Sequence, residues 1–208
     1  MLKIENTHVD NIVRAVYSAR NAMNSWDKSD SNFETDTLGD NDLALAKKLS
    51  KAGTDHSKFL RMINVTCDIV APLYWWKEFD TYKVGTVRNS CSTMHKIHEK
   101  EFTLDDFSHE HLIVAGLNSL NRTIDDLNSC RNGYLNEEIS KNPEWKKEIW
   151  WQMIQLLPSS YNQRGTVQMN YQVLKNIYKS RKGHKLDEWQ TFREWCETLP
   201  YFVEICGE

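Results

Sequence analysis

An amide and a guanidinium stand at the two ends of an apolar stripe in the segment Met169–Trp189. On a 3.6-residue period, Asn170 and Arg181 fall in line with Leu174 and Ile177, at spacings of 4, 3 and 4 residues. A guanidinium can hold a phosphate through two directed hydrogen bonds, and burying it without a partner is costly. We therefore predict that Arg181 lines a pocket and binds an anionic ligand such as a phosphate.

Each end of this stripe also has a purely structural interpretation. Arg181 could be a solvated charge at a helix end, where the helix dipole favours a cation. Asn170 could simply cap the helix. Lys83 and Arg88 are further cations that could hold a phosphate.

Four histidines lie close together in the sequence: His95, His98, His109 and His111. They could form a metal site or be exposed and capping residues. Their spacing fits no zinc pattern, and no cysteine is placed to complete one. We therefore predict no bound metal.

The elements that position these groups are expected to form one α+β domain over residues 1–208, with a small central sheet and a helix-rich second half. Residues 61–70 alternate between apolar and polar side chains, which is typical of a half-buried strand. Ala71-Pro72 ends it and starts a short aromatic helix. The segment from Met169 predicts a helix, because no Pro or Gly occurs before Gly183.

Further helices and one more strand follow from local patterns. Residues 1–9 predict a short strand, and residues 9–22 a helix. Residues 40–53 predict a helix with an Asn or Asp cap, after a polar loop. A long amphipathic helix is indicated by the stripe Ile113, Leu117, Leu120, Ile124 and Leu127.

Composition excludes several classes of protein. The 208 residues carry a formal net charge of −3, and no long Lys/Arg run indicates general nucleic-acid binding. No apolar run approaches a membrane span, and the first residues lack the apolar core of a signal peptide. The five cysteines are scattered, so we expect a reduced, cytoplasmic protein without structural disulfides.

The segment from Met169 resembles the C-terminal helix of the flavin-dependent thymidylate synthases. That family has the pattern N-x-R-x-L-x-N-x-x-x-x-R followed by a Trp, and Asn170, Asn176, Arg181 and Trp189 stand at matching places. The resemblance implies that the two Asn contact flavin and that Arg181 grips the nucleotide substrate. Gln172 stands where the family has a second substrate-binding Arg.

Residues 56–97 follow the family's layout without gaps, from a His near the flavin and folate site through the strand and the short aromatic helix. The signature R-H-R-x-x-S-x-N-E-x-S-x-R-Y is much altered, at Thr81, Tyr82, Lys83, Thr86, Arg88, Asn89, Cys91, Thr93 and Met94. The resemblance implies that the cofactor is bound by His56 and Tyr82 together with the two Asn. It implies that the substrate is bound by Lys83, Arg88, Asn89, Gln172 and Arg181.

Cys91 replaces the family's Ser near the pyrimidine. It could be a small core residue, or a thiolate that adds to a pyrimidine ring and so acts as the catalytic nucleophile. Both alternatives stay open on the sequence.

Two functions are compatible with the resemblance. The first is a flavin-dependent enzyme that binds a dUMP-like nucleotide and FAD and uses methylenetetrahydrofolate and NADPH for methyl or one-carbon transfer. The second is an inactive viral protein that sequesters a nucleotide or signalling ligand, since the chain also resembles divergent bacteriophage and prophage relatives, which would place it in the host cytoplasm. The family's pocket lies between subunits, so we expect a homotetramer.

Overall fold

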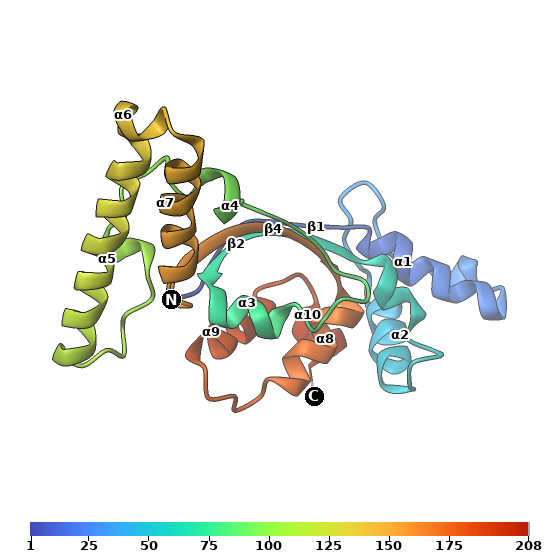
Figure 1. Cartoon of the computed structure of the whole chain (residues 1–208). Coiled ribbons are helices and arrows are strands. Elements are labelled where there is room, and N and C mark those ends of the chain that lie inside the picture. Colours follow the sequence, from blue (N-terminus) through green and yellow to red (C-terminus); the bar gives the residue numbers. More distant parts are fainter. Residues whose placement is uncertain (208) are drawn as a thin grey trace. The chain divides into compact units, whose positions relative to one another are not determined.

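The computed structural model describes residues 1–207 and divides into two compact units, each assembled from separate stretches of chain (Figure 1). The first unit contains Met1, Val70–Glu78 and Ser90–Gly165. The second contains Leu2–Ile69, Phe79–Asn89 and the chain from Thr166 onward. The two units are described separately below, and the prediction of a single domain over the whole chain stays a prediction.

One four-stranded sheet has the order β1-β2-β4-β3. Its strands are β1 (Lys3–Asp10), β2 (Asn64–Pro72), β3 (Val87–Ser90) and β4 (Asn162–Asn170). The small central sheet and the α+β class are therefore confirmed. In β2, Val65, Cys67 and Ile69 are buried and the residues between them are partly exposed, as the alternating pattern predicts.

The predicted helix start at Met169 is wrong by two residues. Met169 and Asn170 are the last residues of β4, and helix α8 spans Tyr171–Ser180. Met169 is buried as a strand residue, in alternation with Gly165 and Val167. The apolar stripe therefore begins at a strand end and not inside a helix.

In the first unit, two long helices pack side by side, α5 (Val114–Leu135) and α7 (Pro143–Leu156) (Figure 1). Shorter helices are α3 (Leu73–Phe79), α4 (Thr93–Lys96), η4 (Leu104–Asp106) and α6 (Glu137–Ser140). The core contains Ile97, Phe102, Phe107, Leu120, Ile124, Leu127 and Met153. The predicted stripe of α5 is thus buried in its middle, but Ile113 is the N-cap residue and is 76% exposed.

In the second unit, the larger helices are α1 (Ile12–Ala19), α2 (Asp40–Lys51), α8, α9 (Asp187–Glu197) and α10 (Phe202–Cys206). Three short turns of 3-10 helix are η1 (Arg20–Met23), η2 (Trp26–Lys28) and η3 (Lys58–Met62). Helix α10 contacts α2, α8 and α9. Their shared core is rich in large side chains, among them Tyr171, Leu174, Trp189, Phe192 and Phe202.

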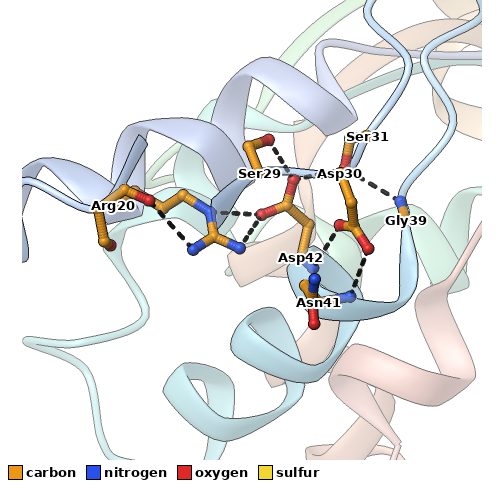
Figure 2. A network of polar contacts seen from close by, with 8 residues as sticks. Arg20, Ser29, Asp30, Ser31, Gly39, Asn41 and Asp42 are labelled. Carbon is orange, nitrogen blue, oxygen red and sulfur yellow. Dashed lines mark hydrogen bonds and ion pairs between the residues drawn. The ribbon is translucent and has the colours of Figure 1, made fainter. Parts of the chain in front are cut away.

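The polar stretch before α2 is organised by a buried ion pair (Figure 2). Arg20 and Asp42 are 5% and 0% exposed, and their charged atoms approach to 2.6 Å. The hydroxyls of Ser29 and Ser31 donate hydrogen bonds to the same carboxylate, at 2.6 and 2.5 Å. Because Arg20, Ser29 and Ser31 all donate to the Asp42 carboxylate, its charge is compensated within the chain.

The N-terminus of α2 is capped by a residue of the preceding loop. The Asp30 carboxylate accepts hydrogen bonds from the backbone N–H groups of Asn41 and Asp42, at 2.9 and 3.1 Å (Figure 2). The N-cap residue itself is Gly39, so the predicted Asn or Asp at that position is wrong. A Cβ on Gly39 would lie 2.3 Å from the Asp30 carboxyl carbon, which explains why glycine occupies it.

The described residues 1–207 contain no helix that combines the length and apolar character of a membrane span.

Candidate functional site

Asn170 caps helix α8. Its side-chain oxygen accepts a hydrogen bond from the backbone N–H of Val173 at 3.1 Å. Gly85, at φ +78°, lies so close that a Cβ there would be 2.9 Å from the Asn170 amide nitrogen. The capping interpretation of Asn170 is therefore correct, and its proposed contact with flavin stays a prediction.

One face of α8 is polar along its whole length. Residues Gln172, Lys175, Asn176 and Lys179 share it at helical spacing. The Gln172 amide nitrogen donates to the side-chain oxygen of Asn176 at 3.2 Å, and the Ser57 hydroxyl donates to the Gln172 side-chain oxygen at 3.2 Å. The structure thus brings together two of the residues that the sequence singles out, Gln172 and Asn176.

This face borders a cavity of about 520 Å³, here called the α8 pocket. Its other wall is the end of α2 and the loop after it. The described residues that line it are Ser50, Lys51, Gly53, Thr54, Ser57, Gln172, Lys175, Asn176, Lys179 and Gly207. Three of them are lysines and none is acidic, so the pocket presents positive charge, amides and hydroxyls to a ligand.

Lys175 is the lysine most strongly held in the α8 pocket. Its ammonium donates hydrogen bonds to the backbone oxygen and the hydroxyl of Ser50, at 2.6 and 2.7 Å. Burial lowers the pKa of Lys175; Cys206 acts in the opposite direction, and the nearby Lys179 adds to the lowering. An anion bound here would favour the charged form of Lys175 and so oppose this shift.

Arg181 is the C-cap residue of α8 and lies beside two aromatic rings. Its Nε donates a hydrogen bond to the Tyr82 hydroxyl at 2.8 Å. The guanidinium carbon is 4.4 Å from the ring centroid of Trp189 and 5.4 Å from that of Tyr82. These contacts limit the orientation of the guanidinium.

A small cavity of about 120 Å³ adjoins Tyr82. Lys83 and Arg88 also line it, so three sequence-predicted residues meet there. Arg88 forms an ion pair with Asp80 at 3.3 Å. Asn89 is exposed on β3 and is not among the lining residues. The substrate roles of Lys83, Arg88 and Asn89 and the cofactor role of Tyr82 remain predictions.

Cys91 belongs to the first unit and is exposed. It borders a cavity of about 170 Å³ together with Lys96, Asn162 and Arg164. The core-residue alternative is therefore wrong for this thiol, whereas Cys67 and Cys206 are buried and burial raises the pKa of each to about 12. Its role as a nucleophile stays a prediction.

The structure gives the histidines different surroundings. His56 is exposed in the loop between Gly53 and Ser57, whose flanking residues Thr54 and Ser57 line the α8 pocket. The His98 ring packs on Tyr134, and His109 Nδ1 lies 2.8 Å from the Phe107 backbone oxygen. Within residues 1–207, no three His, Cys, Asp or Glu side chains gather as a metal-binding group.

The lysines of the α8 pocket were missed on the sequence. Lys175 and Lys179 look like ordinary solvated positions on an amphipathic helix. The sequence feature that could have revealed Lys175 and Lys179 is that no acidic residue lies on the helix face they share with Gln172 and Asn176. Lys51 comes from α2, and its place beside this face depends on the tertiary fold.

The structure is similar over its full length to solved thymidylate synthases and to a solved UMP/dUMP methylase. Thymidylate Synthase X (ThyX) from Helicobacter pylori with FAD and dUMP superposes with a TM-score of 0.70 at 17% identity, covering 100% of this chain and 98% of that one. A second structure of the Helicobacter pylori enzyme with FAD and dUMP gives 0.69 at 18% identity, covering 99% and 98%. The UMP/dUMP methylase PolB from Streptomyces cacaoi, bound with 5-Br dUMP, gives 0.63 at 13% identity, covering 99% and 94%.

No protein-family model and no curated protein sequence matches the chain. At these levels of identity the structural likeness establishes the fold. The predicted flavin-dependent thymidylate synthase-like fold is thereby confirmed.

Proposed function

We propose that this chain, which has the fold of the flavin-dependent thymidylate synthases, binds a dUMP-like pyrimidine nucleotide and FAD. The observation that carries the proposal is the α8 pocket: Gln172 and Asn176, two positions of the family pattern, share one cavity with three lysines. Phosphate groups need cations and directed donors, and a flavin ring edge needs amides. The solved enzymes of the same fold are bound to FAD and dUMP, or to a dUMP analogue.

The residues of the α8 pocket fit one phosphate-bearing half of FAD. Its volume of about 520 Å³ is in the range of small-molecule sites, about 300–1,000 Å³. Lys175, Lys179 and Lys51 would neutralise the phosphates, and Asn176 would hydrogen-bond polar ring or ribose atoms. His56, Tyr82 and Asn170 are the further residues that we assign to the cofactor. Bound FAD would supply the redox chemistry.

The nucleotide phosphate is assigned to Arg181, with Lys83, Arg88, Asn89 and Gln172 as further substrate-binding residues. Support comes from the packing of the Arg181 guanidinium against Trp189 and from its hydrogen bond to Tyr82. The reaction that we propose is the transfer of a methyl or one-carbon unit from methylenetetrahydrofolate to the pyrimidine, with NADPH as reductant. Cys91 is its proposed nucleophile, on the grounds of its exposed thiol.

The test of cofactor binding begins with the absorbance spectrum of the purified protein, because bound flavin absorbs blue light. Titration calorimetry with FAD should give saturable binding, and Asn176→Ala should weaken it by about 0.5–1.5 kcal/mol, the value of a hydrogen bond. Asn121→Ala, an exposed Asn on α5, is the matched control and should change nothing. A colourless protein without an FAD-dependent thermal shift would contradict the assignment of FAD.

Catalysis is tested separately with dUMP, methylenetetrahydrofolate, FAD and NADPH. Release of tritium from the pyrimidine C5 position would show the transfer, and Cys91→Ser should reduce the rate if the thiol is the nucleophile. Nucleotide binding without turnover would limit the function to binding.

We also propose a homotetramer. Large apolar side chains are exposed on and beside the long helices of the first unit, among them Ile113, Val114, Trp145 and Trp151. Burying such side chains between copies would be favourable. Light scattering at micromolar concentration is expected to give the mass of four chains, and a strict monomer would contradict this assembly.

A further inference from the structure

The first unit contains a second and larger cavity, of about 660 Å³, here called the α5–α7 cavity. It lies where α4, the end of α5 and the start of α7 meet. Its lining includes Met94, His95, Tyr134, Lys146, Lys147 and Trp150. None of the residues assigned above to cofactor, nucleotide or nucleophile lines it, so the proposed function gives it no role.

The walls of the α5–α7 cavity are held in place by contacts within the chain. The Trp150 indole N–H donates to the Met94 backbone oxygen at 3.0 Å and so joins α7 to α4. The Tyr134 ring packs on the His98 ring, with centroids 4.6 Å apart. Asn142 caps α7 through the backbone N–H groups of residues 144 and 145. Two aromatic faces are therefore in fixed positions before any ligand binds.

The charged side chains that line the α5–α7 cavity are all basic. Lys146 and Lys147 line it, and His95 adds an imidazole ring to the lining. The Lys146 ammonium lies 4.7 Å from the centroid of the Tyr134 ring. No lining residue is acidic, and neither lysine forms an ion pair with any side chain in residues 1–207. The cations are therefore available to an anionic ligand.

We propose that the α5–α7 cavity is a binding site for a planar aromatic anion, a molecule whose ring carries a carboxylate or a phosphate. The ring would lie against Tyr134 and Trp150, and the anionic group would reach Lys146 and Lys147. The volume suits a small molecule, because such sites measure about 300–1,000 Å³. Aromatic walls select a flat ring, and the lysine pair selects negative charge.

The test uses naphthoate as the probe and naphthylmethanol as its uncharged counterpart, each titrated into the full-length protein by calorimetry. Naphthoate should bind at least about 10-fold more tightly, which corresponds to about 1.4 kcal/mol. The double variant Lys146→Ala/Lys147→Ala should lower naphthoate affinity about 10-fold or more. Lys141→Ala is the matched control, because Lys141 pairs with Glu138 and does not line the cavity.

Three results would overturn the proposal. They are equal affinity for the charged and uncharged probes, unchanged naphthoate affinity in the double variant, and a change of oligomeric mass when naphthoate binds, which would make the cavity a subunit contact. Titration of naphthyl phosphate, which keeps the ring of naphthoate, distinguishes a phosphate from a carboxylate as the preferred anion. Thermal unfolding and FAD affinity should be the same in the double variant and in Lys141→Ala, which separates this site from the α8 pocket.

Discussion

Two regions of the second unit contain positive charge, and they differ in whether the chain supplies a carboxylate to compensate it. In the network around Asp42, the Arg20 guanidinium meets a carboxylate at 2.6 Å, and two serine hydroxyls complete the shell (Figure 2). In the α8 pocket, three lysines line a cavity with no acidic residue among its lining side chains. A charge that the chain compensates contributes to folding, whereas a charge beside a cavity without a carboxylate favours a ligand.

The pKa values follow the same division. Burial alone would raise the pKa of Asp42, but hydrogen bonds from Ser29, Ser31 and Arg20, together with the Arg20 charge, hold it below its ordinary value. The pKa of Lys175 is also lowered, which for a lysine means that the charged form is disfavoured. The network thus favours the charged form of Asp42, whereas the α8 pocket disfavours the charged form of Lys175.

The largest expected effect is that of Asp42→Asn. It leaves the buried Arg20 charge without its carboxylate, so the free energy of unfolding should fall by about 3–5 kcal/mol in a urea denaturation curve. Glu138→Gln breaks the Lys141–Glu138 pair, whose side chains are 69% and 80% exposed, and should cost only about 0–1 kcal/mol. Equal losses in the two variants would show that the buried Arg20–Asp42 pair stabilises the fold no more than an exposed pair does.

The same carboxylate makes a stability contribution that depends on pH. Because the pKa of Asp42 is lower in the folded chain than in the unfolded one, its contribution is present above the ordinary carboxyl pKa and is lost as pH falls through the lowered value. The difference in unfolding free energy between the natural chain and Asp42→Asn should therefore shrink in acid.

Lys175→Ala tests the α8 pocket. It should reduce FAD affinity by about 1.5–3 kcal/mol, the range for hydrogen bonds to charged groups, and should cost at most about 1 kcal/mol of unfolding free energy. Lys48→Ala removes an exposed lysine of α2 outside the pocket and serves as the control. A variant that loses stability but keeps its FAD affinity would show that Lys175 belongs with Arg20 as a structural cation.

Arg181→Ala should leave the fold intact and cost about 1.5–3 kcal/mol of dUMP affinity by calorimetric titration. Arg181→Lys should recover only part of the loss, because an ammonium cannot reproduce the planar fork or the packing on Trp189. Unchanged affinity in both variants would exclude Arg181 from the nucleotide site and leave it as a packing residue.

The smallest expected effect is proton uptake on binding. An anion in the α8 pocket should raise the lowered pKa of Lys175, so binding takes up protons just below the ordinary lysine pKa of about 10.4. Affinity should fall as pH rises through this window. Calorimetry in two buffers of different ionisation enthalpy measures the uptake, which should be absent in Lys175→Ala.

Patterns along the chain predict the elements whose apolar residues repeat clearly. The alternation in β2 and the stripe of α5 are examples. Strand β4 was missed because polar residues occupy most of it and only Val167 and Met169 are buried large apolar residues. The last two residues of β4, Met169 and Asn170, also fit the helix pattern of the segment that follows. The sequence therefore did not show that the helix begins at Tyr171.

The candidate site was predictable only at positions that align with the family pattern. Asn176 and Arg181 match that pattern, and Gln172 stands where the family has an Arg; the structure gives Gln172 and Asn176 a common cavity. The facing wall, with Lys51 and several hydroxyls, comes from residues 50–57, more than a hundred positions earlier. Nothing local in the sequence relates those two segments, since their proximity arises from packing.

Because Asp30 caps α2, the loop that carries Asp30 and the first turn of α2 must separate before either can open to solvent. The amide hydrogens of Asn41 and Asp42 are held by a carboxylate from the loop, so they can exchange with solvent only when loop and helix separate. The far end of the same helix supplies Ser50 and Lys51 to the α8 pocket. A ligand seated there would therefore slow hydrogen exchange at the opposite end of α2, because it raises the free energy of the opened state relative to the closed one.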